Sequence, residues 1–184
     1  MKRILPPLLT LATLAFVSVP TFAADTAAYR EIKWEKLVPP GWDGEKVLKG
    51  LDLNKLQDSD PRAMEALDKM REAWNNAPVE TALKGTKIRI PGFAIPLDKS
   101  GGNVREFLLV PYFGACIHSP PPPANQIIHV IATKPVKGLK TMDTVWVMGD
   151  MDLIRTDSPW GVVGYRLNKA FTEPYVEKGG RNGR

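Results

Sequence analysis

The stretch TKIRIPGFAIP, Thr86–Pro96, opens a β-rich region that begins at Gly85. Its β-branched and aromatic residues recur in short runs, which is typical of strands. Pro91 cannot donate a hydrogen bond to a neighbouring strand, and Gly92 permits a bulge. The sequence therefore predicts a strand that kinks at this Pro-Gly pair.

Four more strands are predicted downstream of this one. They are Arg105–Pro111, Gln126–Thr133, Thr144–Ile154 and Val162–Phe171. A hairpin turn is expected at Lys99–Asn103, KSGGN, and a loop at Arg155–Gly161. Arg105–Pro111 is apolar on both faces, which indicates a central strand. Short strands without intervening helices favour a mainly β fold, and a small five-stranded barrel of the OB type is the natural candidate.

One helix is predicted before the barrel. The segment Pro61–Asn75, PRAMEALDKMREAWN, has Asp60 at the capping position and a proline in its first turn. Its apolar residues fall at helical spacing and indicate a stripe that faces the core. The stripe consists of Met64, Leu67, Met70 and Trp74.

The segment upstream of the helix predicts an extended arm. Trp34 and Trp42 stand near Pro39 and Pro40 in a stretch without periodicity. Such isolated tryptophans suggest an arm laid over the domain with its indoles buried.

The N-terminus has the features of an export signal. Lys2 and Arg3 precede the uncharged apolar run Ile4–Val19, and Thr21-Phe22-Ala23 supplies the small residues that a signal peptidase reads. A retained membrane anchor is the alternative, but the run is short for a bilayer span of roughly 20 apolar residues. We expect a periplasmic protein with four parts: residues 1–23 as signal peptide, 24–58 as arm, 59–176 as helix plus barrel, and 177–184 as a flexible tail.

Charge and cysteine content restrict the classes of protein. The formal net charge of +5 falls to +3 without the signal, because Lys2 and Arg3 are its only charged residues. Such a mildly basic balance argues against a nucleic-acid partner. The single cysteine excludes an internal disulfide.

The segment FLLVPYFGACIHSPPPPANQIIHVI, Phe107–Ile131, holds the only cysteine, Cys116, and both histidines, His118 and His129. Cys116 and His118 would share one face of an extended segment. A chain reversal after Pro123 would bring His129 opposite His118. One thiolate and two imidazoles suit zinc or copper(I), so zinc is the candidate cofactor.

Three other interpretations stay open. Cys116 could be the nucleophile of a thiol-dependent enzyme, with a histidine lowering its pKa. It could instead be a small buried residue, and His129 could belong to an apolar face with Ile127 and Ile131. A rigid, donor-poor ridge of prolines and aromatics could also dock a partner protein without any metal. The residues of that binding surface are Tyr112, Phe113, Pro120, Pro121, Pro122, Pro123, Asn125 and Gln126.

From Trp34 to Tyr175 the chain resembles a bacterial family of exported proteins catalogued as domain of unknown function 3299. The segments that carry the likeness are KGTKIRIPGFAIPLD, PYFGACIHSPPPPANQ, TVWVMGDM and GVVGYRLNKAFTEPY. The matching motif residues are Cys116, His118, Pro120–Pro123, Asn125 and Gln126. Some relatives are encoded beside ABC-type transporter components linked to zinc acquisition. The resemblance thus implies a non-enzymatic accessory or binding protein of an envelope transport system, with zinc handling through the Cys-x-His pair.

Overall fold

The computed structural model describes residues 28–46, 49, 60–97, 102–115 and 121–176. The predicted signal peptide, the C-terminal tail at 177–184, most of the turn Lys99–Asn103 and three parts of the predicted arm (24–27, 47–48 and 50–58) lie outside these residues.

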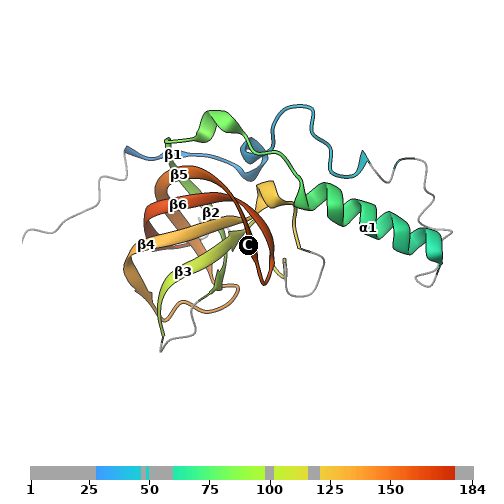
Figure 1. Cartoon of the computed structure of the whole chain (residues 1–184). Coiled ribbons are helices and arrows are strands. Elements are labelled where there is room, and N and C mark those ends of the chain that lie inside the picture. The colour runs from blue at the N-terminus through green and yellow to red at the C-terminus, as the bar shows by residue number, and fades with distance from the viewer. Residues whose placement is uncertain (1–27, 47–48, 50–59, 98–101, 116–120, 177–184) are drawn as a thin grey trace, which may run out of the picture.

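Five strands close into a barrel (Figure 1). They are β2 (Lys87–Pro96), β3 (Asn103–Val110), β4 (Ile128–Lys137), β5 (Thr144–Ser158) and β6 (Gly161–Pro174). The order around the barrel is β2-β3-β4-β6-β5, and the pairing of β5 with β2 closes it. Only the β4–β6 contact between barrel strands is parallel. The predicted mainly β fold with an OB-like five-stranded barrel is confirmed.

The predicted loop Arg155–Gly161 is wrong. β5 continues to Ser158 and β6 starts at Gly161, so that only Pro159 and Trp160 form the turn. The Ser158 hydroxyl donates to the Gly161 carbonyl at 2.7 Å and accepts from the Trp160 N–H at 3.1 Å. The end of β5 carries exposed residues such as Asp157, so it lacks the apolar pattern that predicts a strand. A two-stranded ribbon can form without an apolar face.

Apolar residues form two clusters, one inside the barrel and one outside its wall. β3 contributes to both, since Phe107 and Leu109 belong to the inner cluster while Leu108 and Val110 belong to the outer one. All four side chains are buried. This explains why β3 reads as apolar on both faces.

β2 changes its partner at the predicted kink. Its residues Phe93–Pro96 pair with β3, whereas Ile88 and Arg89 pair with the short strand β1, Arg30–Glu31, of the arm. Between these two regions the indole Nε1 of Trp34 donates to the carbonyl of Pro91 at 2.7 Å. Pro91 has no N–H to leave unpaired at this gap. The expected arm on the barrel is thus observed around Trp34, which lies in a 3₁₀ helix, Trp34–Leu37.

Helix α1, Pro61–Asn75, has the predicted bounds and cap, with the Asp60 carboxylate accepting from the Arg62 N–H at 2.9 Å. The prediction that its apolar stripe faces the core is wrong. The helix extends away from the barrel (Figure 1), Ala66 is its only buried residue, and Met64 is 60% exposed.

Two contacts hold the C-terminal end of α1. The Arg155 guanidinium of β5 donates to the Asn75 carbonyl and to the Asn76 side chain, each at 2.8 Å. Trp74 donates to the Gly44 carbonyl at 3.1 Å, so the arm covers the end of the stripe. Among the described residues, no helix is long and apolar enough to cross a bilayer.

Candidate functional site

The predicted metal ligands Cys116 and His118 lie outside the described residues. The thiol-enzyme hypothesis depends on the same cysteine. The metal site and the thiol enzyme therefore both stay predictions. His129 lies on β4, and its Nε2 is 2.9 Å from the Glu106 carboxylate of β3. Within the described part of the chain, no three Cys, His, Asp or Glu side chains gather to hold a metal.

The proline segment braces the hairpin of β5 and β6. Pro121 is exposed and Pro122 is buried, while Pro120 lies outside the described residues. A Cβ added at Gly161 would lie 2.8 Å from the Cβ of Pro121. Pro123 then starts the 3₁₀ helix Ala124–Gln126.

Asn125 and Gln126 each bind a neighbouring segment of the chain. Asn125 is fully buried and its amide donates to the Pro78 carbonyl at 2.9 Å. The amide of Gln126 donates to the Trp34 carbonyl at 3.2 Å. These two residues connect the arm and the segment before β2 to the barrel.

Tyr165 of β6 makes a third such connection. Its hydroxyl donates to the Leu37 carbonyl of the arm at 2.6 Å and accepts from the Glu80 N–H. Burial raises the pKa of Tyr165 to about 12. No pattern in the sequence singled out this residue.

Tyr112 and Phe113 lie on the surface, 45% and 69% exposed. Phe113 packs edge-on against Phe93 of β2, with ring centroids 5.8 Å apart and an interplanar angle of 82°. Phe113 is therefore both exposed to solvent and packed against a strand of the barrel.

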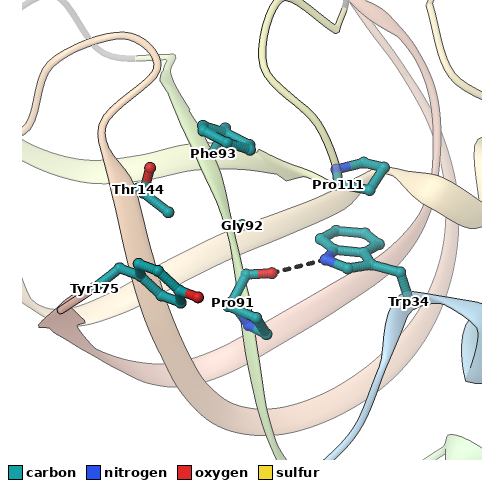
Figure 2. A pocket seen from close by; sticks show the side chains of 7 residues that line it. All are labelled: Trp34, Pro91, Gly92, Phe93, Pro111, Thr144 and Tyr175. Atoms are coloured by element: carbon teal, nitrogen blue, oxygen red, sulfur yellow. Dashed lines mark hydrogen bonds between the residues drawn. The ribbon is translucent and has the colours of Figure 1, made fainter. Parts of the chain in front are cut away.

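Phe93 is also part of a pocket of about 520 Å³ on the outer face of β2 (Figure 2). The residues that line it are Trp34, Pro91, Gly92, Phe93, Pro111, Thr144 and Tyr175. They come from the arm, from β2, from just beyond β3, from the start of β5 and from just beyond β6. The hydroxyls of Thr144 and Tyr175 make no hydrogen bond to any described residue.

A second hollow of about 540 Å³ adjoins the pocket and shares Tyr175 with it. Trp146 stacks on Tyr175 at 5.8 Å and lies 3.8 Å from the guanidinium of Arg89. Arg89 in turn pairs with Glu31 at 3.1 Å and Glu173 at 3.5 Å. We call the pocket and this hollow together the aromatic groove.

The aromatic groove offers flat apolar faces, two hydroxyls and two carboxylates. These groups can pack against, hydrogen-bond and attract a bound partner. The sequence predicted Tyr112 and Phe113, beside the groove, as binding residues. It did not predict that Trp34, Phe93 and Tyr175 lie together. These three are far apart in the chain, and only the closure of the barrel and the arm brings them together.

The protein is thus a small OB-type barrel with an N-terminal arm packed on it and an aromatic groove on its outer face. Residues 34–174 match the family model described as "Protein of unknown function (DUF3299)", and the chain belongs to this family. The crystal structure of a DUF3299 family protein from Pseudomonas aeruginosa PAO1 is similar, with 35% sequence identity and a TM-score of 0.61. The match covers 83% of this chain and 99% of that one. No curated protein matches the chain.

Proposed function

We propose that this protein is a non-enzymatic binding protein that docks a partner through the aromatic groove. The observation that supports this most is Phe113, which is 69% exposed and packs on Phe93 at the rim of an open pocket. Exposed aromatic clusters beside a hollow are typical of the anchor points of protein interfaces.

The groove is held in shape before any partner arrives. Trp34 is fixed by its hydrogen bond to Pro91, and Tyr175 by its stacking on Trp146 and a backbone hydrogen bond to Thr144. A preorganised surface loses little conformational freedom on binding, which favours affinity.

We place this activity in the periplasm and propose a component of an envelope transport system as the partner. The signal-like N-terminus and the family resemblance support this assignment. Zinc handling would be a second property of the same protein, and it would depend on Cys116 and His118 with His129 as third ligand. The carboxylate of Glu106, 2.9 Å from His129, favours this role, because carboxylates commonly orient metal-binding imidazoles.

Photo-crosslinking in living cells tests the docking function. A photoreactive phenylalanine analogue replaces Phe113 in one strain and Lys134 in a control strain. Lys134 is exposed on β4, a strand that does not pair with β2. We expect one discrete adduct from position 113, no adduct from position 134, and loss of the adduct when Tyr175 is also changed to alanine. Equal labelling from both positions would refute the docking surface.

A further inference from the structure

We propose that the occupant of the aromatic groove is an extended, proline-containing peptide segment that carries one basic residue. This inference rests on the docking function proposed above and names the chemistry of the partner. It follows from the length of the groove, from the groups that line it and from its charge.

The length of the groove suits a short extended peptide. Phe93, Pro91 and Arg89 alternate along the outer face of β2, with Phe93 in the pocket and Arg89 in the second hollow. Four strand residues span about 13 Å. A polyproline II segment rises by about 3.1 Å per residue, so roughly four residues cover both hollows.

The lining of the pocket matches the needs of a polyproline II chain. Aromatic faces from Trp34, Phe93 and Tyr175 provide flat surfaces on which proline rings can pack. A polyproline II chain has no internal hydrogen bonds, and therefore its carbonyls need external donors. The free hydroxyls of Tyr175 and Thr144 can supply them, whereas the indole N–H of Trp34 already binds Pro91.

The charge of the second hollow favours a basic residue at one end of the peptide. The side chains of Glu31 and Glu173 are 60% and 44% exposed there, while that of Arg89 is 27% exposed and lies against Trp146. Two carboxylates and one guanidinium leave a net negative charge. Lys87 follows on the same face of β2 but lines neither hollow, and its ammonium lies over the Tyr29 ring at 5.9 Å.

Titration calorimetry with synthetic peptides tests this proposal on the purified protein. The probe is a blocked hexaproline with one terminal arginine. Two controls carry glutamate in place of the arginine or glycine in place of the prolines. We expect saturable binding of the probe, several-fold weaker binding of the glutamate peptide, and no binding of the glycine peptide.

Variants assign the binding to the groove. Tyr175→Ala should weaken the probe about tenfold, as expected for loss of an aromatic anchor. Glu173→Gln should reduce the preference for the arginine peptide over the glutamate peptide about threefold. Glu72→Gln on α1 is the matched control for a lost carboxylate and should have no effect. A thermal melt of each variant confirms that it is folded.

Two results would overturn the proposal. One is the absence of saturable binding at millimolar peptide, and the other is equal binding of the proline and glycine peptides. If either occurs while position 113 still forms its adduct in cells, the groove docks a partner of different chemistry. If the adduct is missing as well, the docking function fails with it.

Discussion

Tyr165 is one of the residues that attach the arm to the barrel. Its hydroxyl joins Leu37 of the arm and Glu80 of the segment before β2. Tyr165→Phe leaves both backbone groups without this partner inside the protein. We expect unfolding in urea to show a loss of about 1–3 kcal/mol. Tyr175→Phe, at an exposed position, should change stability by no more than about 0.5 kcal/mol.

The same tyrosine makes stability depend on alkaline pH. An unfolded tyrosine ionises near pH 10, whereas the folded pKa of Tyr165 is about 12. The folded state therefore retains a proton that the unfolded state loses, and stability falls as pH rises from about 10 through 12. Urea midpoints at about pH 9 and about pH 11 measure this decline. The decline should be smaller in Tyr165→Phe. An equal decline in the two proteins would contradict the assignment to Tyr165.

Gly161 tests the contact between the hairpin and the proline segment. Its φ is +120°, and an added Cβ would lie 2.8 Å from Pro121. Gly138 also has a positive φ, +69°, but an added Cβ would meet nothing within 4 Å. Gly161→Ala should therefore cost about 1–3 kcal/mol more than Gly138→Ala, because alanine meets Pro121 and because a φ of +120° is less accessible to it than +69°. Equal losses by thermal unfolding would show that the contact with Pro121 contributes nothing to the cost.

Single residues show where sequence reasoning about the site ends. Local apolar neighbours suggested that His129 belongs to an apolar face, but β4 presents it on the outside of the barrel beside Glu106. Glu106 lies one residue before the segment Phe107–Ile131 that holds the cysteine and both histidines. Strand pairing brings it to His129. Glu106 and Leu108 share one face of β3 because they are two residues apart, and Leu108 lies opposite His129 in the register. Long-range register of this kind is not encoded in local spacing.

The elements themselves were more accessible to sequence reasoning. Alternating β-branched residues gave all five barrel strands, and the Asp-Pro cap gave α1. These signals are local, since they depend on backbone chemistry at the residue concerned. The direction in which α1 packs is not local. Its helical spacing of apolar residues was real, yet the arm covers Trp74 while Met64 stays exposed.

The arm is an element whose removal should loosen β2 selectively. Trp34→Phe keeps an aromatic ring but removes the N–H that binds Pro91, so we expect a loss of about 1 kcal/mol. Hydrogen exchange should accelerate at Ile32, whose amide donates to Arg89, more than at residues of β4. Unchanged exchange at Ile32 would mean that Tyr165 and Gln126 hold the arm alone.

For the whole molecule, zinc content separates metal handling from docking. If the Cys-x-His pair binds metal, purified protein loaded with zinc should retain about one equivalent. Cys116→Ser and His118→Ala should each abolish retention, while the peptide affinity of the groove stays unchanged. Protein that binds neither zinc nor copper(I) with micromolar affinity would end the metal role and leave the docking role intact.

The wall of this barrel is completed by a segment remote in the chain. Trp34 meets a residue 57 positions away, and Leu37 meets one 128 positions away. A segment that completes the fold across such distances can complete the same fold in a second copy, with identical contacts. Refolding at high concentration should therefore yield a fraction of arm-exchanged dimers that dissociate only when the barrel opens.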